Sequence, residues 1–173
     1  NNANLTVTRF FVGAANEIGS IASGTVNQSG GTVTETSTSL GDFIIGGRSP
    51  DSINGVGVYN LSGGTMIANS AVSVGGWGSG TVNQSGGTFM APSFDGGVII
   101  QHYPGFGGTY NLNGGVLKTF GITTGVTASD PRFNSIFNFN GGTLQPTEDN
   151  DTFMQALSRV NVRDGGAVID TAG

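Results

Sequence analysis

Acidic side chains are the first candidates for chemistry, because paired carboxylates can serve as general acid and base or as calcium ligands. The densest group is Glu148, Asp149 and Asp151, within the stretch "TEDND". The simpler interpretation is a solvated helix start, since negative charge is favourable near the N-terminal end of a helix dipole. We therefore expect neither a metal ion nor a cofactor at this group.

The only histidine, His102, lies beside Tyr103 in "IIQHYPGFGG", and the chain has no cysteine. A lone histidine without thiolates is a poor basis for a metal cluster, and no Gly-x-Ser-x-Gly nucleophile motif accompanies it. Arg48, Trp77 and Tyr103 occupy equivalent positions in "FIIGGR", "VSVGGW" and "VIIQHY". Exposed aromatic rings among polar groups suit stacking against sugars. The candidate glycan contacts are therefore Arg48, Trp77, His102 and Tyr103; the plainer alternative is that these rings only cover an edge of the fold.

Composition argues against two classes of partner. The 173 residues include 6 basic and 11 acidic side chains, a net charge of −5, which leaves no basic patch for nucleic acid. No apolar run reaches the ~18 residues of a membrane-spanning helix, so we expect no membrane insertion by this segment. Glycine accounts for 32 residues and charged residues for 10%, a composition that favours short strands joined by tight turns.

Internal repeats must position these side chains. The stretch "GTVNQSGGT" occurs twice, and the full set of copies is "TVNQSGGTV" (25–33), "VYNLSGGTM" (58–66), "TVNQSGGTF" (81–89), "TYNLNGGVL" (109–117), "IFNFNGGTL" (136–144) and a weaker "VNVRDGGAV" (160–168). A looser unit lies between them, in "FFVGAA" (10–15), "FIIGGR" (43–48), "VSVGGW" (72–77), "VIIQHY" (98–103) and "GITTG" (121–125). Repeats of 23 to 33 residues with short strands and glycine turns are typical of a β-solenoid. We predict an all-β, right-handed parallel β-helix of about six coils, a single domain over 1–173.

Each copy of the main repeat carries an asparagine followed by a double glycine. The glycines lie between two strands, at a corner where they reach positive φ without the steric penalty of a Cβ atom. The asparagines recur at one position of successive coils, so we expect them to stack as a ladder. The predicted structural ladder comprises Asn27, Asn60, Asn83, Asn111, Asn138 and the pairs Gly30, Gly31, Gly63, Gly64, Gly86, Gly87, Gly114, Gly115, Gly141, Gly142.

Strand alternation leaves open which way the asparagines point. Val26 and Gln28 lie on one face of their strand and Asn27 on the other. Val33, after the corner, begins a column of large apolar residues that we place inside. Either the columns at Val26 and Gln28 also face the interior, or the asparagines point inward and bond to corner backbone. We prefer the apolar interior, although the glutamines complicate it.

One segment departs from the strand pattern. In "EDNDTFMQALSR" (148–159), an acidic or amide N-cap precedes good helix formers. Phe153, Met154 and Leu157 can then face one side. The sequence predicts one short helix near 151–158, packed against the flank of the solenoid.

Three stretches carry a resemblance to a known family. "TYNLNGGVL", "FNFNGGTLQP" and the tail "TFMQALSRVNVRDGGAVIDTAG" resemble the autotransporter-associated β-strand repeat proteins of Gram-negative and related bacteria. The resemblance covers about Gly24 to Gly173. It implies a right-handed parallel β-helical passenger, export to the extracellular space or bacterial cell surface, and a structural or adhesive role without catalytic residues.

The terminal stretches "NLTVTRFFVG" and "GGAVIDTAG" are strand-like and lack obvious polar caps. Because a solenoid end exposes an unpaired strand edge, we expect the chain to continue in a longer passenger or to stack end to end as a homo-oligomeric fibre. The expected function is a non-enzymatic structural or adhesive rod in a surface fibre, sheath or passenger. One alternative is a carbohydrate-binding module using the Trp77–Tyr103 flank. Another is a polysaccharide lyase or glycoside hydrolase, which we disfavour because no repeat column carries two acidic residues.

Overall fold

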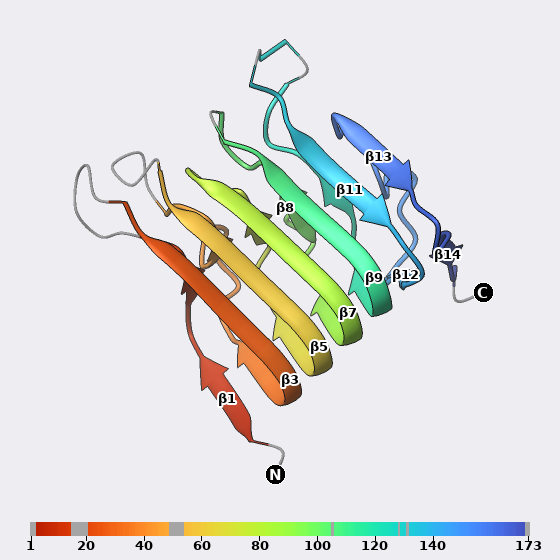
Figure 1. Cartoon of the computed structure of the whole chain (residues 1–173), viewed down its shortest axis with the longest axis horizontal. Coiled ribbons are helices and arrows are strands. Elements are labelled where there is room, and N and C mark those ends of the chain that lie inside the picture. Colours follow the sequence, from red (N-terminus) through yellow and green to blue (C-terminus); the bar gives the residue numbers. More distant parts are fainter. Residues whose placement is uncertain are drawn as a thin grey trace.

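The chain is an all-β parallel solenoid in the computed structural model, which describes residues 3–14, 21–48, 54–104, 106–127, 129, 130 and 132–171. Successive coils stack strand on strand, and the named strands pair in parallel in every case. The long strands lie side by side across the molecule, and the two termini lie at opposite ends of the stack (Figure 1). The predicted fold class is confirmed, apart from the short helix.

A complete coil has three faces, and the first two belong to one continuous strand that bends at the double glycine. These strands are β3 (Ser23–Glu35), β5 (Val56–Ala68), β7 (Ser79–Ala91) and β9 (Gly108–Thr119). In the last two coils the faces are separate strands, β11 (Ser135–Phe139) with β12 (Thr143–Pro146) and β13 (Arg159–Val162) with β14 (Val168–Ile169). At the other end, β1 (Asn4–Val7) adds a strand to the second face beside β3.

The third face is a separate sheet of short strands in the order β10-β8-β6-β4-β2. Each strand matches one copy of the looser repeat unit: β2 (Phe10–Val12), β4 (Phe43–Ile45), β6 (Val72–Val74), β8 (Val98–Ile100) and β10 (Ile122–Thr123). Because the first and third faces close around the same interior, every coil contributes inward side chains from both repeat units.

The predicted glycine corner is confirmed, with the second glycine at positive φ in the first four copies (Gly31, Gly64, Gly87 and Gly115) and the first glycine, Gly141, in the fifth. Gly64 has a φ of +81°, and a Cβ atom there would lie 2.4 Å from the Gly31 carbonyl oxygen. Its partner Gly63 would place a Cβ atom 2.6 Å from the Ser29 carbonyl oxygen. The first glycine is therefore required by the close approach of the preceding coil, and the second also by its left-handed backbone.

The interior is apolar, as preferred from the sequence, and the asparagines point outward. Tyr59, Val82, Tyr110 and Phe137 are fully buried in the column that begins at Val26, and the column after the corner from Met66 to Leu144 is buried too. Aromatic rings contact one another along the core, as in the stacked pair Tyr110–Phe137, whose centroids are 5.4 Å apart. This continuous core joins the coils into one body.

The glutamines that complicated the sequence interpretation are satisfied inside the core. The Tyr59 hydroxyl donates to Gln28 Oε1 in the preceding coil, and Gln28 Nε2 donates to the Thr65 carbonyl at 2.9 Å. The same arrangement recurs two coils further on, where the Tyr110 hydroxyl donates to Gln84 Oε1 at 2.7 Å. Burial raises the pKa of both tyrosine hydroxyls, so they stay protonated and remain donors.

The helix predicted over 151–158 is wrong, because that part of the chain pairs with a sheet edge instead. Ile122 N donates to the Phe153 carbonyl at 2.7 Å, and Gln155 N donates to the Ile122 carbonyl at 3.1 Å. Met154 forms an isolated parallel bridge with Ile122. The segment thus supplies the next strand position of the third face, and Phe153 and Met154 still pack against the core.

The expected helix cap is used differently as well. Asn150 Nδ2 donates to the Phe120 carbonyl at 2.9 Å, while Asn150 Oδ1 accepts from Thr152 N at 2.9 Å. A helix of only two turns forms too few hydrogen bonds to offset the free-energy cost of helix nucleation. An existing sheet edge offers ready backbone partners, so edge pairing prevails over local helix propensity.

Candidate functional site

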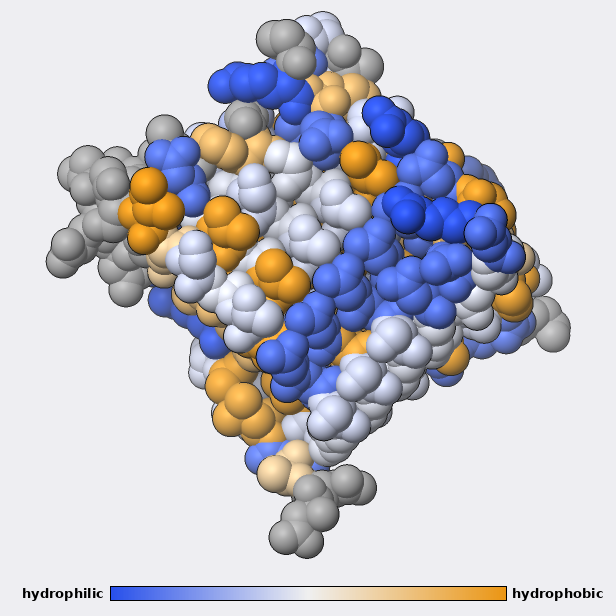
Figure 2. All heavy atoms as spheres, viewed as in Figure 1, coloured by the Kyte–Doolittle hydropathy of each residue, from blue (hydrophilic) through white to orange (hydrophobic). Residues whose placement is uncertain are grey.

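The outward column of the first face is an unbroken ladder of asparagine side chains. Each Nδ2 donates to Oδ1 of the asparagine one coil earlier, at 2.7–2.8 Å. Figure 2 shows the ladder's surroundings as a hydrophilic band that crosses the strands. The predicted members are all present and the weak sixth copy adds one more, giving Asn27, Asn60, Asn83, Asn111, Asn138 and Asn161.

Register explains the asparagine ladder. Identical residues stand directly opposite one another in the parallel pairings, from Asn27 with Asn60 to Asn138 with Asn161. Adjacent strands are about 4.8 Å apart, a spacing that one side-chain amide spans to the next. Each interior amide both donates and accepts, and each bond contributes about 1 kcal/mol net. The ladder therefore couples every coil to its neighbours on the outside of the core.

At both ends of the described stack, apolar side chains next to the buried columns are exposed. At the C-terminal end, Val160 is 45% and Val162 64% exposed, although they continue the columns of the buried Phe137 and Phe139. At the N-terminal end, Leu5 is 51% exposed. A cavity there is lined by residues of β1 and β3, among them Leu5, Val26, Gln28 and Val33. These apolar columns have no neighbour beyond the last described coil at either end.

The candidate glycan residues form a stack of rings over the third face. Trp77 stacks on Tyr103 with centroids 4.3 Å apart, and His102 stacks on Tyr103 at 4.2 Å. Both rings are nearly parallel to Tyr103, and two rings so close cannot share one of its faces without overlap. They therefore occupy opposite faces of Tyr103, and a sugar would have to stack on an outer face of the set, that of Trp77 or that of His102.

The fourth candidate glycan contact lies apart from this stack. The Arg48 guanidinium stands 4.7 Å above the ring of Phe11. His102 Nδ1 lies 2.8 Å from Ser73 Oγ, which places the imidazole directly over the third face. Burial lowers the pKa of His102, because the charged form loses solvation. The ring stack accordingly covers the third face, which is the plainer of the two sequence interpretations, and the glycan assignment stays a prediction.

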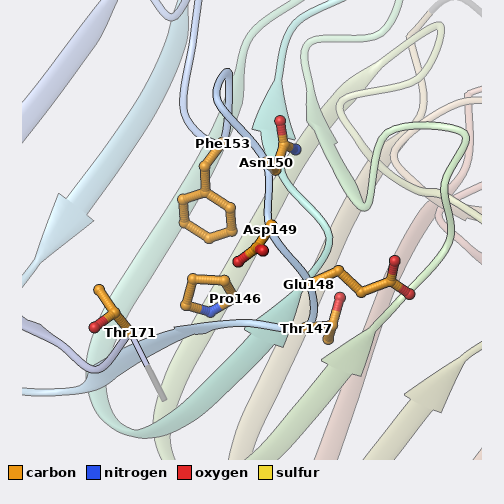
Figure 3. Close-up of a pocket in the computed structure, with 7 residues that line it drawn as sticks. All are labelled: Pro146, Thr147, Glu148, Asp149, Asn150, Phe153 and Thr171. Carbon is orange, nitrogen blue, oxygen red and sulfur yellow. The ribbon is translucent and has the colours of Figure 1, made fainter. Parts of the chain in front are cut away.

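Two of the three acidic residues at the predicted helix start, Glu148 and Asp149, line a shallow cavity (Figure 3). Glu148, Asp149 and Asp151 are exposed, and Figure 3 shows the carboxylates of Glu148 and Asp149 turned in different directions. Within the described ranges, no group of three acidic or histidine side chains is arranged to hold a metal ion. The geometry gives this group no convergent ligand set.

Two buried polar residues escaped the sequence interpretation. Glu35 is fully buried, and its carboxylate accepts from Ser37 N at 2.5 Å and from Ser70 N and Oγ at 3.1 and 2.9 Å. Gln101 has a φ of +57° at a corner position where three other coils have glycine. Its side chain holds the following loop by accepting from Asn134 N at 2.6 Å and donating to the Arg132 carbonyl. The signal for Gln101 was its replacement of a repeated glycine.

An aromatic groove on the C-terminal half was also missed. Phe94 is 68% exposed, and its ring lies 5.0 Å from that of Phe120 in a tilted arrangement. Polar side chains from the following coils, including Thr123, Asn150 and Gln155, line the same groove. Neither phenylalanine belongs to a repeat column, so periodicity offered no signal.

Comparison of the chain with protein-family models, curated proteins and solved structures finds no match. The resemblance to autotransporter-associated repeats therefore stays a prediction carried by the repeat and tail sequences. Within the described part of the chain, no helix has the length and apolarity needed to cross a membrane.

Proposed function

We propose that this chain is a non-enzymatic extracellular structural or adhesive protein, a rigid β-solenoid rod that contributes to a bacterial surface fibre, sheath or passenger. The observation that carries this proposal is the continuity of the stack. One amide ladder runs without interruption from β3 to β13, and one apolar core runs alongside it from β3 to β12.

Rigidity follows from how each coil is held. A coil is fixed to its neighbour by backbone bonds on its faces, by an outward amide bond and by buried rings. In a solenoid the total stability is roughly the sum of such nearest-neighbour terms. Bending the rod would break several of these terms together at one junction, so a stiff spacer is the mechanical role that suits this geometry.

The location is supported by sequence rather than by geometry. The resemblance to exported repeat proteins and the low charged content are the reasons for placing the rod outside the cell. Arg48, Trp77, His102 and Tyr103 lie on the third face, where the loops would be available for contacts along such a rod.

The location is tested by labelling cells of the source organism with an antibody raised against the purified chain. We expect labelling of intact cells and loss of the signal after brief external protease treatment. A cytoplasmic protein labelled only after permeabilisation is the matched control. If this chain too is detected only after permeabilisation, the extracellular assignment is wrong.

A carbohydrate-binding module is the second candidate, and the Phe94–Phe120 groove is the observation that favours it. An exposed ring beside amide and hydroxyl groups is the combination that sugars contact in proteins. A glycan array distinguishes the two aromatic regions. Loss of a hit in Phe94→Ala but not in Trp77→Ala would place binding in the groove, and the reverse would place it on the Trp77 ring. No hit with the unsubstituted chain would remove this candidate.

A further inference from the structure

The two ends of the asparagine ladder are chemically complementary. At the N-terminal end, Asn27 Oδ1 accepts from Asn60, and Asn27 Nδ2 has no partner among the described residues. At the C-terminal end, Asn161 Nδ2 donates to Asn138, and Asn161 Oδ1 has no partner within the same ranges. A ladder of amides with one common orientation has a free donor at one end and a free acceptor at the other. This also holds if the oxygen and nitrogen of every amide are exchanged.

The columns beside the ladder end in matching residues. The outward column that starts at Thr25 ends at Arg159, and the inward columns that start at Val26 and Gln28 end at Val160 and Val162. In a head-to-tail contact, Val160 would lie beside Val26. Val162 would lie beside Gln28, whose side chain already has its hydrogen-bond partners. On the third face, the column from Phe10 likewise ends at Met154.

We propose that a second copy of this chain docks head to tail on the first, with β3 of one copy pairing in parallel with β13 of the other. The register is Arg159–Thr25, Val160–Val26 and Asn161–Asn27, so the ladder continues across the junction. The proposal rests on the proposed role as a rod and names the partner that lengthens it.

The second face adds a geometric condition. On that face β1 pairs with β3 as the outermost strand at the N-terminal end. At the C-terminal end, β14 pairs with β12 as the outermost strand. When β3 of the incoming copy pairs with β13, the β1 strand of that copy would need the position beside β12 that β14 already fills. One strand must leave, and β14 pairs over two residues whereas β1 pairs over four. Displacement of β14 lets β1 pair with β12, with Leu5 beside Leu144.

Engineered cysteines test the register directly, because the native chain contains none. Thr25→Cys and Arg159→Cys lie in one outward column and leave the asparagines untouched. Neighbouring parallel strands bring Cα atoms within the 4.4–6.8 Å that a disulfide spans. The two single variants are mixed under mild oxidation, and disulfide dimers are resolved by mass spectrometry.

We expect the ratio of mixed to symmetric dimers to exceed the statistical ratio by about 10-fold, a free-energy preference of about 1.4 kcal/mol. Ser62→Cys, an exposed position on the lateral surface, replaces Thr25→Cys in the control mixture and should give only the statistical yield. A mixed dimer that forms only at its statistical yield in the test mixture would overturn the head-to-tail arrangement.

Sedimentation of the full chain tests the interface residues. A charge at the exposed Val162 blocks strand addition at an open edge, so Val162→Lys should weaken association by about 10-fold or more. Val56→Lys makes the same change at a lateral position that is 44% exposed, and should leave association unchanged. Circular dichroism of both variants verifies folding. A chain that stays monomeric at millimolar concentration contradicts the proposal.

Truncation tests the strand displacement. Deleting 167–173 removes β14 and should strengthen association by about 10-fold, because the incoming β1 then meets no competitor. If the truncated chain associates more weakly than the full one, β14 belongs to the interface and the displacement is wrong. These measurements need only purified protein, so they can fail while the cell-surface location holds, and the converse also applies.

Discussion

The first and third faces of the same coils achieve stacking in two different ways. On the first face, one residue type repeats in every coil, and each asparagine bonds to its own copies. On the third face, the outward column is mixed, and its buried members Ile44, Ser73 and Ile99 lie under local cover. His102 contacts Ser73, and the corner glycine Gly76 lies against Ile44.

This difference indicates which face can grow. A side chain satisfied by its own copies needs no cover, so the first face presents the same chemistry at its last coil as at its first. A mixed column needs a specific loop for each coil, and each loop fits one place only. The first face is therefore the natural junction for a further coil, whereas the third face carries the features that distinguish one coil from the next.

The largest expected effect comes from the corner that joins the first and second faces. Gly64→Ala would place a Cβ atom 2.4 Å from a carbonyl oxygen at a φ of +81°. Steric overlap with backbone cannot be relieved by a side-chain rotation, so we expect a loss of about 3 kcal/mol or more in unfolding free energy. Chemical denaturation followed by circular dichroism measures this loss.

Gly41→Ala is the matched control for that substitution. Its φ is +88°, but apart from its chain neighbours no atom of the described residues lies within 4 Å of the added Cβ. Only the backbone penalty remains, about 1–2 kcal/mol. Equal losses at the two positions would show that the close approach of coils does not set the requirement for glycine.

The buried polar pairs of the first face should give the next largest effect. Tyr110→Phe leaves Gln84 Oε1 in the core without its donor, a cost of about 1–3 kcal/mol. Adding Gln84→Leu reproduces the Leu112–Phe137 combination of the following coil and should recover at least half of the loss. Thermal unfolding of the single and double variants measures the coupling.

Tyr103→Phe provides the third-face counterpart. That ring acts through stacking on Trp77 and His102, which phenylalanine preserves. We expect a change within about 0.5 kcal/mol. A loss as large as that of Tyr110→Phe would remove the contrast between a satisfied core and a covering ring stack.

The ladder itself should show a position-dependent effect. Asn83→Ala removes two amide bonds and Asn27→Ala only one, so we expect losses of about 2 and about 1 kcal/mol. Urea unfolding of both variants gives the ratio. Identical losses would mean that the ladder does not couple adjacent coils.

The smallest effect concerns pH and the third face. Burial lowers the pKa of His102 in the folded state, so the unfolded chain binds the proton more readily. The stabilising contribution of neutral His102 is present above its unfolded pKa and declines as pH falls through that value towards the folded one. His102→Gln should therefore flatten the dependence of melting temperature on pH between 7 and 5. An unchanged slope would assign the dependence to carboxylates instead.

Much of the fold could be read from repetition. The corner glycines and the register of the asparagines follow from spacing alone, because a stack of parallel coils aligns equivalent residues. The Gln–Tyr pairs also left a signal, since each glutamine copy precedes a coil with tyrosine one column away. What could not be read were irregular segments such as 148–159, where local helix propensity competed with a sheet edge whose position depends on the whole stack.

The sequence by itself determined the repeat unit, the corners and the alternation of residues along each strand, because these depend on local backbone geometry and spacing. Only the tertiary structure decided that the asparagines face outward, that the glutamines are satisfied by tyrosines of the next coil, and that the segment after Asn150 pairs with a sheet edge. The physical reason is that each of these features depends on contacts between coils. Such contacts are fixed by the register of the stack rather than by any single strand.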